Sequence, residues 1–249
     1  MCVAALAWHA HPRWRLVAIG NRDEYHARPA APLAQWDDGS GTVAGRDLVG
    51  GGTWLGVTDS GRFALITNRR GFGDPDPARR SRGELVAGLL NSDAAPAALE
   101  AYNPFNLLAV AGDSLEYLTN RAESLRTPLG HGVYGLSNGA IDEPWPKTLA
   151  LKGALTDWLN AASDDPAPLF AILASADRPA LGLPSGEPSD IAIEPRDTPP
   201  FIRGAVYGTR CSTVVTVDRE GRGRMVERRF DTNGTSTGDT ALDFRWPAA

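Results

Sequence analysis

Paired strand-like segments recur along the whole chain, and this pattern constrains the fold most strongly. Four pairs of apolar runs are each separated by a short segment of turn-forming residues. The pairs are Val3–Trp8 with Trp14–Ile19, Thr53–Thr58 with Arg62–Thr67, Phe105–Ala111 with Leu115–Asn120, and Ala205–Val217 with Arg224–Phe230. Because the two strands of a hairpin pair antiparallel, the sequence predicts mostly antiparallel sheets rather than alternating βαβ units.

Helical spacing of apolar residues falls between these hairpins. It predicts helices over Ser81–Leu90 and Pro146–Ala162, with shorter ones at Pro96–Tyr102 and Leu169–Ala174. Ser81, followed three residues later by Glu84, is typical of a capping box at a helix start. The alternation of hairpins and helices, with no internal repeat or boundary, indicates one α+β domain over residues 1–249.

Composition narrows the classes of function. The hydrophobic fraction of 42% and the charged fraction of 22% are those of a soluble globular protein. A net charge of −5 argues against a nucleic-acid partner. No run is long enough for a membrane span, and the apolar start is too short for a signal peptide, so a cytoplasmic location is expected. The oligomeric state is left open.

The two cysteines, Cys2 and Cys211, form no disulfide framework and no zinc-binding pattern, so we expect no metal or other cofactor. Cys2 has a second interpretation. Removal of Met1 would give it a free α-amine that titrates near pH ~8 and can take the proton of its own thiol. One residue would then supply both nucleophile and base. The alternative is that Cys2 is a small apolar residue that opens a strand.

One catalytic motif is present but incomplete. Gly135-Leu136-Ser137-Asn138-Gly139 matches the Gly-x-Ser-x-Gly turn of serine hydrolases. That mechanism needs a histidine later in the chain than the serine, and the last histidine here is His131. The order of residues therefore excludes a serine hydrolase of this type.

Polar residues follow four apolar stretches, which are Leu16–Ile19, Phe63–Ile66, Val133–Leu136 and Val206-Tyr207-Gly208. The polar segments are Asn21-Arg22-Asp23-Glu24, Asn68-Arg69-Arg70, Ser137-Asn138-Gly139 and Thr209-Arg210-Cys211-Ser212. If these strand ends meet near the start of the first strand, one pocket would contain a carboxylate for the α-amine, amide donors for an oxyanion and a guanidinium near the thiolate.

These segments resemble a known family. The tetrapeptide Asn21-Arg22-Asp23-Glu24 is the one that names the NRDE family, the relatives of the transport and Golgi organisation protein. Further matches lie in order along almost the whole chain. They are Gly51-Gly52-Thr53-Trp54-Leu55-Gly56, Leu65-Ile66-Thr67-Asn68, Ser81-Arg82-Gly83-Glu84-Leu85-Val86, Leu136-Ser137-Asn138, Pro144-Trp145-Pro146-Lys147, and Gly208-Thr209-Arg210 with Ser212-Thr213-Val214.

The family in turn resembles the N-terminal-nucleophile hydrolases related to penicillin V acylase and conjugated bile salt hydrolase. The resemblance implies a four-layer αββα sandwich in which Cys2 attacks a linear amide. It also implies that Asp23 holds the α-amine, that Asn68 and Asn138 are site amides, and that Arg210 is a distal arginine. The predicted catalytic residues are Cys2, Arg22, Asp23, Asn68, Asn138 and Arg210, and the predicted substrate-binding residues are Asn21, Glu24, Trp54 and Arg69.

The chain departs from the acylases at Gly20, where they carry an arginine. Arg22 is the nearest replacement, but it is adjacent to Asp23, and adjacent residues of a strand point to opposite faces. Either a bulge re-aims Arg22, or the chemistry of the site differs from that of the acylases.

Two other functions compatible with the resemblance stay open. A non-catalytic protein could use the same pocket to carry haem, a lipid or an acyl-CoA, as is implied for eukaryotic relatives. Acyl transfer to an amine through the same thioester is the other alternative.

Overall fold

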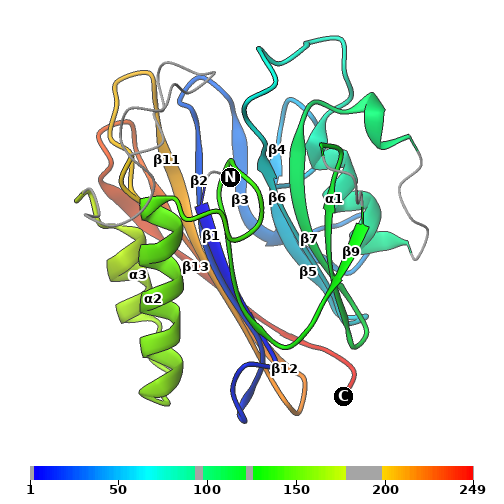
Figure 1. The fold of residues 1–249 in the computed structure, drawn as a ribbon, viewed down its shortest axis with the longest axis vertical. Helices are drawn as coiled ribbons and strands as arrows, with labels where there is room; N and C mark the ends of the chain where they lie inside the picture. Colours follow the sequence, from blue (N-terminus) through cyan, green and yellow to red (C-terminus); the bar gives the residue numbers. More distant parts are fainter. Residues whose placement is uncertain (1–2, 93–97, 122–125, 178–197, 249) are drawn as a thin grey trace.

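The computed structural model describes residues 3–92, 98–121, 126–177 and 198–248 of the chain. Within them the strands form two antiparallel sheets (Figure 1). The first sheet has the order β10-β1-β2-β11-β12-β13. Its strands are β10 (Gly132–Leu136), β1 (Val3–Trp8), β2 (Trp14–Tyr25), β11 (Tyr207–Asp218), β12 (Arg222–Phe230) and β13 (Ser236–Arg245).

The second sheet runs in sequence order from β3 to β9. Its strands are β3 (Ala30–Gln35), β4 (Thr42–Asp47), β5 (Leu55–Thr58), β6 (Arg62–Asn68), β7 (Phe105–Ala111), β8 (Ser114–Thr119) and β9 (Arg126–Leu129). Both sheets are antiparallel throughout, so the sequence-based prediction of mostly antiparallel sheets is confirmed.

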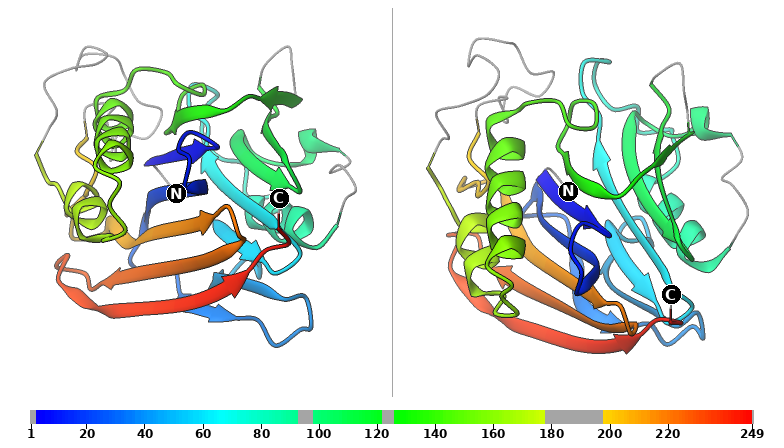
Figure 2. Two further views of the ribbon diagram at one scale, coloured as in Figure 1. Left: turned by 90° about the horizontal axis from the view of Figure 1, so that it is seen from below. Right: turned by 60° about the horizontal axis from the view of Figure 1, so that its bottom comes forward.

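Three helices cover the outer faces of the sheets (Figure 2). Helices α2 (Pro146–Asn160) and α3 (Ala167–Leu173) pack on the first sheet, and α1 (Arg82–Asn91) packs on the second. Side chains of β1 are buried on both faces of the first sheet. Its Leu6 and Trp8 point toward the second sheet, whereas Val3 packs with the side chains of α2 and α3. This follows from the alternation of side chains along a strand.

The predicted helices form with small shifts of their ends, but the predicted capping box does not. Ser81 is the N-cap of α1 and makes no side-chain cap hydrogen bond within the described part of the chain. One carboxylate oxygen of Glu84, Oε2, instead accepts hydrogen bonds from Nη2 and Nε of Arg80, at 2.7 and 3.0 Å. Of the predicted helix Pro96–Tyr102, the described residues contain a 3₁₀ turn at Leu99–Ala101, and its first residues lie outside the described ranges.

Two strand ends lie elsewhere than predicted. Strand β2 continues to Tyr25, so the tetrapeptide that starts at Asn21 lies within a strand and does not follow one. Strand β11 begins at Tyr207, so Arg210 lies near its start and not after its end. The polar residues of β2 are accommodated because hydroxyls of β11 lie opposite them and bond to them.

Candidate functional site

The start of β1 is the point where the predicted site residues meet. Val3, the first described residue, pairs with Asn21 of β2, and Ala4 pairs with Leu136 at the end of β10. The tetrapeptide of β2 and the segment after β10 therefore flank the first residues of β1 on its two sides. Cys2 itself lies outside the described residues.

The second sheet reaches the same place through Asn68, the last residue of β6. The side-chain amide of Asn138 donates to the backbone carbonyl of Asn68 at 2.8 Å, and the Arg70 N–H donates to the Asn138 carbonyl at 2.9 Å. Thr67 Oγ1 also donates to the Ser137 carbonyl at 2.6 Å. These bonds join the sheets at the site, so the predicted convergence of Asn68 and Asn138 is present in the structure.

A buried network supports this junction from behind. Asn106 of β7 donates to the Gly139 carbonyl at 2.7 Å and accepts a hydrogen bond from the Tyr117 hydroxyl at 2.6 Å. Arg69 donates to that hydroxyl at 3.2 Å. Burial raises the pKa of Tyr117, which keeps the hydroxyl protonated and able to donate. Arg69, predicted to bind substrate, therefore bonds to this network.

Asn138 is held in one orientation. Its amide nitrogen donates a hydrogen bond to the Asn68 carbonyl, and its side chain is fully buried. The side-chain oxygen accepts no hydrogen bond from any described residue. Since that oxygen is an acceptor, Asn138 is suited to hold an N–H group rather than an oxyanion.

Arg22 and Asp23 occupy opposite faces of β2. Asp23 accepts a hydrogen bond from the Thr209 hydroxyl at 2.6 Å. The Arg22 guanidinium lies 4.5 Å from the ring centroid of Trp54, which belongs to the core between the sheets. The register shift is in β11, between Thr209 and Cys211, so the bulge lies opposite Arg22 and Asp23 and not in β2.

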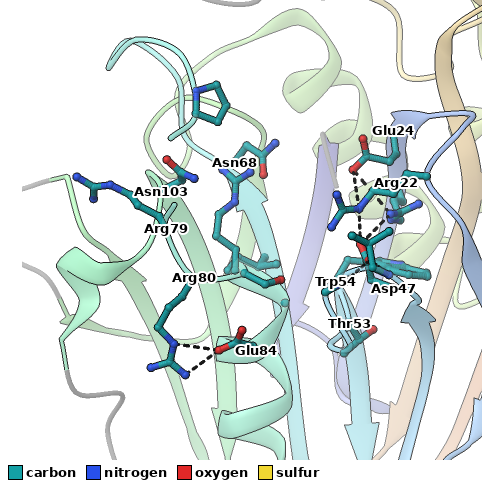
Figure 3. Close-up of a pocket in the computed structure, with 18 of the residues that line it drawn as sticks. Arg22, Glu24, Asp47, Thr53, Trp54, Asn68, Arg79, Arg80, Glu84 and Asn103 are labelled. Carbon is teal, nitrogen blue, oxygen red and sulfur yellow. Dashed lines mark hydrogen bonds and ion pairs between the residues drawn. The ribbon is translucent and has the colours of Figure 1, made fainter. Parts of the chain in front are cut away.

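Acidic residues pair with Arg22 (Figure 3) and with its neighbour Arg28. Asp47 accepts from Arg28 at 2.7 Å and from Arg22 at 3.4 Å, and Glu24 lies 3.7 Å from Arg22. Burial alone would raise the pKa of Asp47, but the Arg28 guanidinium and the Gly50 N–H outweigh it and lower that pKa. The carboxylate of Asp47 is thus kept ionised between the two arginines.

Two other predicted site residues, Arg210 and Asn21, form hydrogen bonds to backbone carbonyls. One guanidinium nitrogen of Arg210 donates to the backbone carbonyls of Tyr25, His26 and Arg28, at 2.9 to 3.2 Å. The turn that follows β2 is therefore held by Arg210. Asn21 is fully buried on the helix side, where its amide donates to the Leu173 and Pro200 carbonyls.

Replacing Asn21 by alanine should lower the free energy of unfolding by about 2 kcal/mol, because buried polar groups would lose their partners. The amide bonds to Leu173 and Pro200 are both 2.7 Å, and the Ser212 hydroxyl donates to Asn21 Oδ1 at 2.6 Å. Urea unfolding of the two proteins measures the difference. Asn233→Ala, at an exposed position, is the matched control and should stay within about 0.5 kcal/mol of wild type. Equal stability of the Asn21 variant would contradict this structural role.

A cavity of about 690 Å³ opens beside these residues and is called the main cavity below. Its volume lies in the range of small-molecule sites. Five of the predicted residues line it: Arg22, Asp23, Glu24, Trp54 and Asn68. Residues of the segment 75–84 form the far wall; Arg79 and Arg80 are labelled in Figure 3, and Arg82 also lines the cavity.

Several groups near the main cavity lie outside the sequence motifs. Asp47 and Arg28 lie at the end of β4 and just before β3, two strands that the hairpin pattern did not predict. Glu227 is 1% exposed in β12 and carries no motif. Within residues 3–92, 98–121, 126–177 and 198–248, no three His, Cys, Asp or Glu side chains are arranged to hold a metal ion. In the same ranges no helix has the length and hydropathy needed to cross a membrane.

Comparison with known proteins finds a matching family model and relatives that carry the same description. A family model described as Transport and Golgi organisation 2 matches residues 1–232. The "Transport and Golgi organization protein 2 homolog" of Bos taurus is 33% identical, over 92% of each chain. The mouse (Mus musculus) relative of similar name is 30% identical over 96% of this chain and 97% of its own.

Among solved structures, the Caenorhabditis elegans N-acylethanolamine-hydrolyzing acid amidase (NAAA) ortholog aligns with a TM-score of 0.48 and 10% identity, over 86% of this chain and 92% of that chain. Similarity of this size carries no statement about activity. The family match and the relatives at 30% identity or more, which cover nearly the full length of both chains, show that this protein belongs to the Transport and Golgi organisation 2 family.

Proposed function

We propose that this protein is an N-terminal-nucleophile cysteine amidohydrolase that cleaves a linear amide through a thioester. One observation carries the proposal: strand segments from both sheets meet at the first residues of β1. Asp23 and Arg22 come from β2, Asn68 from β6, and Asn138 from the segment after β10. Cys2 precedes Val3 by one peptide bond, which supports a place for its thiol among them.

The arrangement of layers supports the same class of fold. Side chains of α2 and α3 pack with the first sheet, the two sheets share the largest apolar cluster, and α1 packs with the second sheet. We take this order as the four-layer αββα sandwich of N-terminal-nucleophile hydrolases.

In the proposed reaction, the α-amine of Cys2 removes the thiol proton, and the thiolate attacks the amide carbonyl carbon. The C–N bond of the tetrahedral intermediate then breaks, and the leaving amine takes the proton from the α-ammonium. Water, deprotonated by the same α-amine, attacks the thioester carbonyl. The acid leaves and the thiol is restored, so the net reaction is hydrolysis.

Each neighbouring residue has a proposed role. Asp23, which accepts a hydrogen bond from Thr209, holds the α-amine and stabilises the ammonium that forms when the amine takes the thiol proton. Asn68 lines the main cavity and donates to the oxyanion, while the unbonded side-chain oxygen of Asn138 accepts from an N–H group. Arg22 lines the main cavity and Arg210 does not, which favours Arg22 as the guanidinium nearest the substrate.

A second candidate is a carrier that binds haem, a lipid or an acyl-CoA without turnover. Five arginines among the lining residues of the main cavity favour an anionic ligand, although acidic residues balance several of them. Titration with haem and with acyl-CoA, followed by absorbance and calorimetry, separates the candidates. Saturable binding without turnover favours the carrier. Absence of binding below roughly 100 μM, an affinity of only ~5 kcal/mol, rejects it.

Intact mass spectrometry tests the amidohydrolase directly. The purified protein is weighed before and after treatment with a thiol-reactive acyl probe. We expect a mass that lacks Met1 and a single acyl addition at Cys2. The second cysteine, Cys211, is 3% exposed, and burial raises the pKa of its thiol, so it should not react. Retention of Met1, or labelling of Cys211 alone, would reject the proposal.

A further inference from the structure

A second, much smaller cavity adjoins the main one. Its volume is about 10 Å³, and it shares two lining residues, Arg22 and Trp54, with the main cavity. We call it the small cavity. Its other lining residues are Ala30, Ala31, Arg210, Cys211, Glu227 and Arg229.

Three of these residues carry a buried polar atom that finds no hydrogen-bond partner within the described part of the chain. The atoms are Arg22 Nη1, Trp54 Nε1 and Glu227 Oε2. Their residues are 3%, 6% and 1% exposed. A buried polar group without a partner costs about 1–3 kcal/mol, so three around one small space are not expected to stay unsatisfied.

The chemistry of these atoms selects the occupant. Arg22 and Trp54 can only donate, and an ionised Glu227 can only accept. A water molecule accepts two hydrogen bonds and donates two, which matches two N–H groups and one carboxylate oxygen. The volume of about 10 Å³ is that of a single water site. A cation would lie among Arg22, Arg210 and Arg229, and an anion would lie against Glu227.

We propose that one water in the small cavity links Glu227 to Arg22 and Trp54, and that Glu227 is thereby a positioning residue for the Arg22 guanidinium at the main cavity. Glu227 is itself fixed, because its Oε1 accepts from the Leu33 N–H of β3 at 2.9 Å. On the opposite side, Arg22 Nη2 donates to Asp47 at 3.4 Å. The guanidinium is then held from both directions, with the Trp54 ring against its face.

The charged groups around Glu227 are consistent with this role. Arg22 comes from β2, Arg210 and Cys211 come from β11, and Arg229 comes from β12, the strand of Glu227 itself. Burial raises the pKa of Glu227, and the Leu33 N–H, Arg229 and the Cys211 thiol oppose that rise. A water that donates to Oε2 stabilises the ionised carboxylate in the same way as these groups do.

High-resolution crystal structures of the wild type, Glu227→Gln and Glu227→Met test the water. Glutamine keeps hydrogen-bonding atoms at this position, and methionine has similar length with only a weak acceptor. We expect a water within hydrogen-bond distance of Arg22, Trp54 and residue 227 in the first two proteins, and its loss in the third. An empty small cavity in the wild type, or an unchanged water in Glu227→Met, would overturn the proposal.

The positioning role rests on the proposed function and needs a second measurement. The rate of Cys2 acylation is followed against pH in the same three proteins. Glu227→Gln should label at close to the wild-type rate, and Glu227→Met should label about tenfold more slowly near neutral pH, which corresponds to a rise of one unit in the thiol pKa. A merely structural defect would lower the labelled fraction without moving the pH profile.

The outcomes separate the two ideas. If none of the proteins is labelled at Cys2 but the water is present, the proposed hydrolase fails and the water site stands. If Glu227→Met is labelled like the wild type at every pH, the positioning role is wrong while the hydrolase stands.

Discussion

Replacement of Cys2 by alanine is expected to abolish amide hydrolysis, with a loss of at least about 10⁴-fold, while the protein stays folded. The loss is large because the substitution removes the attacking atom, and the remaining site groups retain only a small part of the catalysis. Product formation from a panel of linear N-acyl amines measures the effect. Thermal unfolding should be unchanged, because the substituted residue precedes the first strand, which begins at Val3.

Two matched proteins separate the thiol from the α-amine. Cys2→Ser keeps the α-amine and offers a poorer nucleophile, so it should also lose most of its activity. A chain with extra residues before Cys2 keeps the thiol, but its α-amine becomes the nitrogen of a peptide bond and can no longer act as a base. This chain should be equally inactive. Full turnover by Cys2→Ala would reject the proposed function, and full turnover by the extended chain would show that the base is another group.

Replacement of Gly52 by alanine should destabilise the protein by about 3 kcal/mol, at the upper end of the usual cost of overpacking. The loop after β4 and the start of α1 touch here through backbone atoms. A Cβ at Gly52 would overlap the Gly83 carbonyl and lie 2.8 Å from the Glu84 nitrogen. Backbone atoms cannot move aside as a flexible side chain can, so the loop must shift away from the helix.

Urea unfolding measures that cost, and Gly88→Ala provides the control in the same helix. Nothing lies within 4 Å of a Cβ at Gly88, which is exposed in α1, so alanine there should stabilise the protein by about 0.5–1 kcal/mol. Because Gly50, Gly83 and Glu84 line the main cavity, the Gly52 variant should also bind ligand more weakly. Equal stability of the Gly52 variant and wild type would show that this contact tolerates a side chain.

Local patterns were sufficient for the strands with dense apolar residues. The predicted strand Val3–Trp8 is β1, and the predicted pair Phe105–Ala111 with Leu115–Asn120 corresponds to β7 and β8. The pattern failed for β3 and β13, which are edge strands of the two sheets. Strand β3 contains Pro32 and an irregular register, and β13 is largely exposed, so neither shows the apolar alternation of a buried strand.

Only those site residues that belong to a sequence motif could be predicted. Asn68 and Asn138 were placed together because each follows an apolar strand, and the structure joins them by a hydrogen bond. Asn21 belongs to one of the predicted polar segments, but its side-chain amide donates instead to the carbonyls of Leu173, the last residue of α3, and Pro200. Asp47 and Glu227 could not be found from the sequence, because their roles depend on partners from distant strands.

The central place of β2 in the first sheet has a consequence for biosynthesis. Asp23 and its partner Thr209 are 186 residues apart in the chain, so the ribosome must add most of the protein before β11 can pair with β2. At about 5–20 residues per second, this leaves roughly 10 to 40 seconds in which the first sheet is incomplete. In the proposed function, an aminopeptidase removes Met1 from the nascent chain during that interval. The late closure of the sheet therefore sets the time available to remove Met1 and expose the α-amine that the proposed reaction needs.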